Sequence, residues 1–349
     1  LLFSLLLSLV CCLLSGALPV WLGGEAAICG AATWYFRICV ATLPVWQFSM
    51  LMGGALRSSG NMRTPGALSV LLCFLDVVGN YVFIFRCKLG VMGAALGTMA
   101  AECIVALLMT YFCVCRSPLL HLWGRGKGRG ESWGLKAKCL ADARRIALPM
   151  AFQQFALCGA QIVSTRLVSP LGTVSIAANS FAITAESLCY MPGYGIGEAA
   201  TTLVGQSVGA RRKDLARHFA WVSISAGMAV MSLAAMVMYA AAPAIMGLLS
   251  PDPAVCSLGA AALRIEMFAE PLFAASIVAT GALRGAGDTL VPGILNLVSM
   301  WGVRISLSLA LIPRYGLEGA WLAMCVELCF RGILFLVRVK REGWLKKLA

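Results

Sequence analysis

The chain has 349 residues, of which 60% are hydrophobic and only 12% are charged. This composition excludes an ordinary soluble domain, because most of the surface must face lipid rather than water. The formal net charge of +13 would suit a nucleic-acid partner, but the positions of the basic residues exclude that partner, as described below.

Apolar stretches long enough to cross a hydrocarbon layer of about 30 Å as helices follow one another along the chain. No stretch shows the alternation of about ten residues that a membrane β-barrel needs. The first stretch resembles a signal-peptide core, but it lacks a preceding basic region and is interpreted as a membrane helix. We therefore predict an all-α polytopic membrane protein with about ten spans, at residues 1–22, 28–53, 66–85, 90–114, 146–168, 174–205, 218–249, 256–282, 290–312 and 317–337.

Residues 37–66 recur 227 positions later as residues 264–293, with eleven of the 30 positions identical and no insertion. Six spans separate the copies, so both copies have the same orientation in the membrane. Parallel repeats of this kind are typical of secondary transporters with two pseudo-symmetric lobes. The second repeat begins near Asp142, which leaves about 86 residues without a counterpart at the front. We therefore expect an intact form with 6+6 helices, in which two further helices precede Leu1.

The basic residues cluster on alternate connections between spans. Even-numbered connections and the C-terminal tail hold 20 of the 28 Lys and Arg residues, and the opposite connections hold three. The positive-inside rule then predicts a cytoplasmic C-terminus in the plasma (inner) membrane. The predicted organisation is an incomplete N-terminal lobe of about four helices at 1–115, a basic Gly-rich cytoplasmic linker at 116–142, a six-helix C-terminal lobe at 143–337 and a basic cytoplasmic tail at 338–349.

Cysteine and histidine offer no reactive pattern. The 15 cysteines lie mostly in apolar spans and form no CxxC pair, and the sequence contains two histidines. We expect buried cysteines that act as small hydrophobes, no metal site and no cofactor. Because no nucleophile with a partner base is evident, we predict that the chain is not an enzyme.

Acidic residues at membrane depth are the candidates for chemistry. Asp76 and Asn80 lie one turn apart on the third span, where they can hold a cation or relay a proton; the alternative is a salt bridge or a hydrogen bond between helices. Glu266 and Glu270 share one face of the eighth span, and mutual repulsion poises at least one of them to exchange a proton or hold a cation. The alternative places Glu266 at the hydrated outer surface beside Arg264.

The sixth span carries Glu186 and Glu198 on either side of the segment MPGYGIG, and both are candidates for lining a substrate cavity. We predict that this Pro- and Gly-rich segment loosens the helix and frees backbone carbonyl groups, whereas the alternative is close helix packing through small residues. Gln153 and Gln154 on the fifth span are candidate neutral donors to the same cavity.

Three arginines within spans have different expected roles. Arg37 and Arg264 are equivalent by the repeat and are expected to tie helix ends in each lobe. Arg304 has no basic counterpart, and we expect it to line the cavity and to neutralise Glu270 or Glu327.

Five motifs occur in matching order along nearly the whole chain: TTLVGQSVGARRKDLARH at 201–218, LRSSGNMRTPG at 56–66, LRGAGDTLVPG at 283–293, and the paired stretches at 89–96 and 315–322. Together they resemble the multidrug and toxic compound extrusion family, known as MATE transporters. The resemblance implies twelve helices in two lobes and export of amphipathic or cationic compounds in exchange for Na⁺ or H⁺. Family members often carry a coupling acid at the position of Phe273, and bacterial members carry the Asp76 and Asn80 pair in the opposite order.

The partners we expect are small amphipathic or cationic substrates and membrane lipids, with no nucleic acid, and the transporter is expected to be a monomer. The alternative is a lipid-linked saccharide flippase of the same superfamily, which would need a strongly cationic cavity for pyrophosphate. The acid-rich set of groups at membrane depth favours the multidrug transporter.

Overall fold

The computed structural model describes residues 2–17, 26–117, 137–341 and 343–348, and within these ranges every regular element is a helix. The prediction of an all-α polytopic protein is therefore confirmed. The chain divides into two compact units, Leu1–Ser132 and Trp133–Ala349, here called the N-terminal and C-terminal units. Most of the predicted basic linker, residues 118–136, lies outside the described residues.

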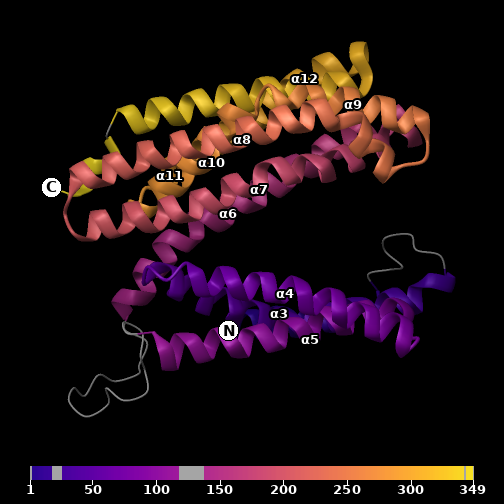
Figure 1. Cartoon of the computed structure of the whole chain (residues 1–349), viewed down its shortest axis with the longest axis horizontal. Coiled ribbons are helices and arrows are strands. Elements are labelled where there is room, and N and C mark those ends of the chain that lie inside the picture. The colour runs from indigo at the N-terminus through magenta and orange to yellow at the C-terminus, as the bar shows by residue number, and fades with distance from the viewer. Residues whose placement is uncertain (1, 18–25, 118–136, 342, 349) are drawn as a thin grey trace. The chain divides into compact units, whose positions relative to one another are not determined.

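The N-terminal unit is built around α5, which packs against α3 and α4, while α1 packs against α3 (Figure 1). A buried cluster of Leu56, Leu68, Val105, Met109 and Cys113 joins α3, α4 and the C-terminal part of α5. The elements are α1 (Leu2–Leu14), α3 (Ala26–Ser58), α4 (Arg63–Tyr81) with the π-helix η1 (Val82–Arg86), and α5 (Gly90–Tyr111) with the π-helix η2 (Phe112–Arg116).

The C-terminal unit is a bundle of long helices in which α7 packs against α8 and α10, and α10 also packs against α12 (Figure 1). Its elements are α6 (Ala137–Val168), η3 (Ser169–Leu171), α7 (Thr173–Gly209), α8 (Lys213–Leu249), α9 (Pro253–Met267), α10 (Glu270–Gly285), α11 (Leu290–Leu297), the π-helix η4 (Val298–Arg304), α12 (Ile305–Lys340) and η5 (Gly343–Leu348).

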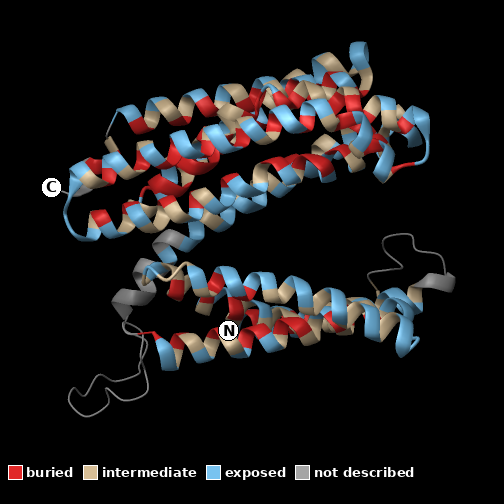
Figure 2. Cartoon of the chain, in the orientation of Figure 1, coloured by how far each residue is buried: buried red, intermediate tan, exposed pale blue. Residues whose placement is uncertain are grey.

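Large apolar side chains are exposed on the outer faces of the helices, as expected of a surface that faces lipid. On α4, Val70, Phe74 and Val77 lie on one face and are 72%, 63% and 68% exposed. Buried residues instead line the faces turned toward neighbouring helices (Figure 2). By length and composition, five helical segments of the described chain qualify as membrane spans: Cys29–Ser58, Arg63–Arg86, Gly90–Arg116, Lys213–Leu249 and Leu290–Lys340.

The last of these segments contains two crossings, because Gly316 adopts a non-helical conformation with φ 58° and ψ −132°. The predicted spans at 290–312 and 317–337 meet at this glycine. The predicted span at 256–282 is two helices, α9 and α10, interrupted at residues 268 and 269. Pro271 follows this interruption and lacks the backbone N–H that a continuous helix would use.

The internal repeat is visible in the backbone. Residues 26–58 form α3, and the corresponding residues 253–285 form α9 and α10. Both copies end in the same turn, with Gly60 at φ 89° and Gly287 at φ 77°. The N–H of Gly60 donates to the Arg57 carbonyl at 2.9 Å, and the N–H of Gly287 donates to the Arg284 carbonyl at 2.9 Å. A left-handed residue at a helix end favours glycine, which explains the identity at this position.

Arg37 and Arg264 make equivalent ties. Arg37 stacks over Trp34 at 5.4 Å and donates from Nε to the Ser15 hydroxyl, just after α1, at 2.7 Å. Arg264 stacks over the Tyr239 ring in α8 at 5.4 Å and donates from Nε to the Tyr239 carbonyl at 3.3 Å. Because α1 corresponds by the repeat to the second half of α8, each arginine joins the same pair of helices in its own unit.

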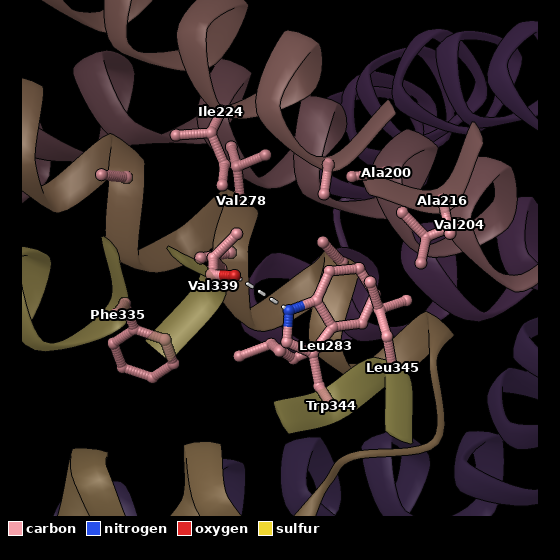
Figure 3. Close-up of a cluster of buried hydrophobic side chains, with 14 residues drawn as sticks. Ala200, Val204, Ala216, Ile224, Val278, Leu283, Phe335, Val339, Trp344 and Leu345 are labelled. Atoms are coloured by element: carbon pink, nitrogen blue, oxygen red, sulfur yellow. Dashed lines mark hydrogen bonds between the residues drawn. The ribbon is translucent and has the colours of Figure 1, made fainter. Parts of the chain in front are cut away.

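The C-terminal segment η5 is part of the hydrophobic core. Trp344 is 1% exposed and donates from Nε1 to the Val339 carbonyl at 3.1 Å (Figure 3). Trp344 and Leu345 belong to a buried cluster with side chains of α7, α8, α10 and α12. Nearby along the chain, Arg338 pairs with the buried Asp288 of the turn after α10, with an Nη2 to Oδ2 distance of 2.6 Å. These contacts fix the end of α12 and η5 onto the bundle.

Trp344→Ala is expected to lower the free energy of unfolding by about 3 kcal/mol, because it removes a fully buried aromatic side chain. The measurement is the melting temperature of the purified protein in detergent. Trp46→Ala is the matched control, since Trp46 is 46% exposed and its loss should leave the melting temperature nearly unchanged. Equal melting temperatures for the two variants would contradict a core role for η5.

Candidate functional site

A cavity of about 450 Å³ lies inside the C-terminal unit, between α6, α7, the α9 and α10 pair, η4 and α12. Both charged and aromatic side chains line it. The charged ones are Glu186, Glu266, Arg304 and Arg331, and the aromatic ones are Tyr190, Tyr194, Phe273 and Trp321. The site therefore combines opposite charges with aromatic surface in one partly open cavity of small-molecule size.

Three carboxyl groups cluster beside this cavity. Glu186 on α7 is 7% exposed, and Glu266 at the end of α9 and Glu270 at the start of α10 are both 0% exposed. The Glu186 carboxyl interacts with both Glu266 and Glu270. Among the described residues, the oxygens of Glu266 and Glu270 have no hydrogen-bond partner of acceptable geometry. Buried carboxyl groups in this situation need a proton or a cation, since isolated buried charges are costly.

The break between α9 and α10 places Glu266 and Glu270 at helix ends of opposite dipole sign. Glu266 lies in the last turn of α9, where the helix dipole is negative, and Glu270 is the first residue of α10, where it is positive. The break is short, because the Ala269 N–H still donates to the Glu266 carbonyl at 2.7 Å and the Phe273 N–H donates to the Ala269 carbonyl at 2.8 Å. The two acids thus stay close while belonging to separate helices. Glu266 is fully buried, so the alternative that placed it at the hydrated outer surface is wrong.

Arg331 is held by its own network on α12. Its Nε lies 3.3 Å from Oε1 of Glu327, and its guanidinium stacks over the Phe273 ring at 5.3 Å. Oε1 of Glu327 also accepts a hydrogen bond from the Ser299 hydroxyl of η4 at 2.5 Å. The expectation that Arg304 neutralises Glu327 is therefore wrong: the partner is Arg331, one helical turn away on the same helix.

Arg304 ends the π-helix η4 and lines the cavity. Its Nη2 contacts the Met324 sulfur, and it interacts electrostatically with Glu186 and Glu266. Extra residues in π-helical turns shift the side chains that follow, and such turns are frequent at functional sites.

The MPGYGIG segment does not interrupt α7, contrary to the prediction. The helix runs without a break from Thr173 to Gly209, with Pro192 inside it. The glycines serve close packing instead: a Cβ at Gly197 would lie 3.4 Å from the Ile277 carbonyl oxygen of α10. Thr201 also donates from its hydroxyl to the Gly281 carbonyl at 2.9 Å. Tertiary contacts with α10 thus outweigh the helix-weakening residues.

The remaining candidates on α6 and α7 are divided between the cavity and other surfaces. Gln154 lines the cavity, whereas Gln153 lies against Gly293 of α11, with its Oε1 3.1 Å from where a Cβ on that glycine would be. Glu198 is exposed and is not among the residues that line the cavity. The structure therefore brings together Gln154, Glu186, Glu266, Glu270 and Arg304.

Asp76 and Asn80 form a separate site in the N-terminal unit. Oδ2 of Asp76 accepts from the Asn80 amide at 3.2 Å, and Oδ1 accepts from the Thr98 hydroxyl of α5 at 2.7 Å. Both side chains are half-buried. Asn80 lies against Gly97, and its Oδ1 is buried without a hydrogen-bond partner among the described residues. The pair is therefore joined both within α4 and to α5.

Sequence reasoning missed several cavity residues. Arg331 lies four residues after Glu327, a spacing that predicts an ion pair on a helix and was an available signal. The aromatic wall had no comparable signal: Tyr190 contacts Tyr194 and Phe273 at ring-centroid distances of 5.8 and 5.9 Å. Trp321 donates from Nε1 to Asn179 at 3.0 Å, across helices far apart in sequence.

Comparison with known proteins places this architecture among transporters. The MatE family matches residues 149–309. A probable multidrug resistance protein NorM of Thermotoga maritima is 24% identical over 93% of this chain and 69% of its own length. A NorM relative of Bacillus cereus is 25% identical over 88% of this chain and 68% of its own length. A Xanthomonas axonopodis NorM relative is 30% identical over 60% of this chain and 46% of its own length.

Solved structures have the same fold. A mutant of the Vibrio cholerae MATE transporter VcmN superposes with a TM-score of 0.89 at 18% identity, covering 99% of this chain and 78% of that one. A MOP superfamily transporter from Pyrococcus furiosus gives a TM-score of 0.89 at 18% identity, covering 100% of this chain and 77% of that one. The family match, the relatives and the fold agree with the five sequence motifs, and they identify an integral membrane transporter rather than an enzyme. Over residues 149–309 the chain is similar to the MATE family of transporters, and it shares their fold.

Proposed function

We propose that the chain is a secondary multidrug efflux transporter that exports organic cations or amphipathic compounds by antiport with Na⁺ or H⁺. The observation that carries the proposal is the cluster of Glu186, Glu266 and Glu270 beside a cavity of the C-terminal unit. Three buried carboxyl groups form a site whose free energy depends on whether a proton or a metal cation occupies it.

Coupling requires that ion and substrate favour different states of the same element. A cation on Glu266 or Glu270 reduces the cost of burying that carboxylate and therefore favours the packed arrangement of α9 and α10. A cationic substrate in the adjoining cavity competes for the same negative charge. Mutual exclusion of this kind is the electrostatic basis that we propose for exchange. Asp76 and Asn80 are a second candidate coupling site in the N-terminal unit.

Other parts of the proposal rest on the sequence. The basic connections support a plasma (inner) membrane location with a cytoplasmic C-terminus. We also propose a monomer that contacts lipids on its exposed apolar faces. The flippase alternative needs a cavity dominated by cations, whereas Arg331 is paired with Glu327 and Arg304 faces acids. That balance favours a substrate with a positive charge.

Expression in a host that lacks its own efflux pumps tests the proposal. We expect ethidium accumulation to fall several-fold relative to the empty vector, and an ionophore that collapses the coupling gradient to restore it. In proteoliposomes, an imposed Na⁺ gradient or an imposed pH gradient then identifies the driving ion, because only one should drive transport. Unchanged ethidium accumulation with the protein present in the membrane would contradict efflux, and inversion of lipid-linked saccharides would favour the flippase.

A further inference from the structure

One buried cluster of the C-terminal unit is rich in sulfur. Four of its nine buried side chains are Cys189, Met238, Met246 and Met267, which come from α7, α8 and the end of α9. The Cys189 sulfur lies 3.8 Å from the Met267 sulfur, and the two residues are 1% and 5% exposed. Thiolate and thioether sulfur are the ligands that soft metal ions prefer. The cluster therefore brings both kinds of sulfur ligand together in one buried place.

The separation of the Cys189 and Met267 sulfur atoms fits a single bound ion. With metal–sulfur bonds of about 2.3 Å, a separation of 3.8 Å corresponds to an angle of about 110° at the ion. Such an angle leaves room for a third ligand. Glu270 begins α10 three residues after Met267, and its carboxylate interacts electrostatically with the Cys189 thiol. Glu270 is 0% exposed, and its oxygens have no hydrogen-bond partner among the described residues, so they are available to a metal ion.

We propose that Cys189 and Met267 bind a soft monovalent metal ion, Cu(I) or Ag(I), with the Glu270 carboxylate as the third ligand. The inference goes beyond the proposed efflux function, because binding at these three side chains does not require transport. The incoming ion takes the place of the proton on the Cys189 sulfur, and that proton is released to water. The charge buried in the site is therefore unchanged, which avoids the desolvation cost that a divalent ion would add.

The surroundings of the two sulfur atoms disfavour harder ions. No three His, Cys, Asp or Glu side chains within the described ranges are grouped as metal ligands. Cys189 also lines a cavity of about 390 Å³ between α7 and α8 whose other lining residues are all apolar. An apolar shell of this kind limits the access of water to a metal site. Cys189 and Met267 are 78 residues apart, so cysteine spacing, on which the expectation of no metal site rested, does not reveal this pair.

Titration of the purified full chain with Cu(I), in nanodiscs and without oxygen, tests this proposal. Competition with bathocuproine disulfonate, a Cu(I) chelator that changes absorbance on binding, measures the affinity of the tightest site. We expect Cys189→Ser to lose one tight equivalent of Cu(I). Met267→Leu keeps the apolar volume and should weaken that equivalent by at least about 10- to 100-fold, the cost of losing even an outer partner of a metal ligand. Glu270→Gln should weaken it in the same direction.

Two further variants separate this site from the other thiols of the chain. Cys73→Ser is the matched control, since Cys73 is an exposed thiol of α4 and its loss should leave the tight equivalent in place. Cys329→Ser tests the rival pair, because Cys325 and Cys329 lie one turn apart on α12 and are hydrogen-bonded to each other. The proposal would be overturned by wild-type protein without a tight equivalent, by a Met267→Leu variant with wild-type affinity, or by loss of the equivalent in Cys329→Ser but not in Cys189→Ser.

Discussion

Glu266→Gln is expected to reduce ion-driven export strongly while leaving the protein folded. Glutamine has the same shape as the protonated acid but can neither release a proton nor offer a charge to Na⁺. Because Glu266 is 0% exposed and has no hydrogen-bond partner of acceptable geometry among the described residues, the amide should not disturb existing contacts. Coupling free energies between ligand sites correspond to about 5- to 150-fold changes in affinity, so gradient-driven transport should fall by a similar factor.

Transport into proteoliposomes and the melting temperature should be measured together. Removing a group whose charged form is costly to bury should keep or raise the melting temperature, which separates lost coupling from lost folding. Glu270→Gln should act in the same direction, whereas Glu318→Gln, at an exposed acid of α12, is the matched control and should transport as wild type does. If Glu266→Gln and Glu270→Gln both transported at the wild-type rate under the gradient, the assignment of the coupling site would be refuted.

Gly281→Ala is expected to destabilise the C-terminal unit strongly. A Cβ at Gly281 would lie 2.8 Å from the carbonyl carbon of Gly197 and 3.0 Å from its Cα, so α7 and α10 would have to separate. Separation would also stretch the hydrogen bond from Thr201 to the Gly281 carbonyl. Overpacking of this kind costs about 1–3 kcal/mol, and backbone on both sides leaves little room for relaxation. The readouts are the melting temperature and the monodisperse fraction in detergent.

The repeat supplies the control for this substitution. Gly54 is the counterpart of Gly281 in α3, but a Cβ there would meet nothing within 4 Å. Gly54→Ala should keep or slightly raise the melting temperature, because alanine has the higher helix propensity. A similar loss of stability in both variants would mean that helix packing at Gly281 is not the cause.

Much of the fold was predictable because membrane crossing imposes a simple requirement on sequence. A helix that crosses lipid must be long and apolar, so the spans are evident, and the repeat at residues 37–66 and 264–293 identified the duplicated turn around Gly60 and Gly287. Positions of helix breaks were less predictable. Pro192 lies inside an unbroken helix, whereas Pro271 follows a break. The difference arises from packing against other helices, which a single sequence does not display.

The candidate site was predictable only in part. Acids at membrane depth stand out because burying them is costly, which led to Glu186, Glu266 and Glu270. Their grouping depends on the rotation of α7 relative to α9 and α10, and the rotation of α6 likewise decides that Gln154, and not Gln153, lines the cavity. Glu327 pairs with Arg331 and not with Arg304, because Arg331 lies one turn away on the same helix.

The interruption between α9 and α10 has a mechanical consequence. Its counterpart α3 is one continuous helix of 33 residues, even though it carries Pro44 at the position that corresponds to Pro271. The second copy consists instead of two shorter helices joined at residues 268 and 269. Since Glu266 and Glu270 flank that joint, a change in their occupancy acts directly where the two helices meet. Duplication thus left this protein with a continuous and a jointed version of the same element.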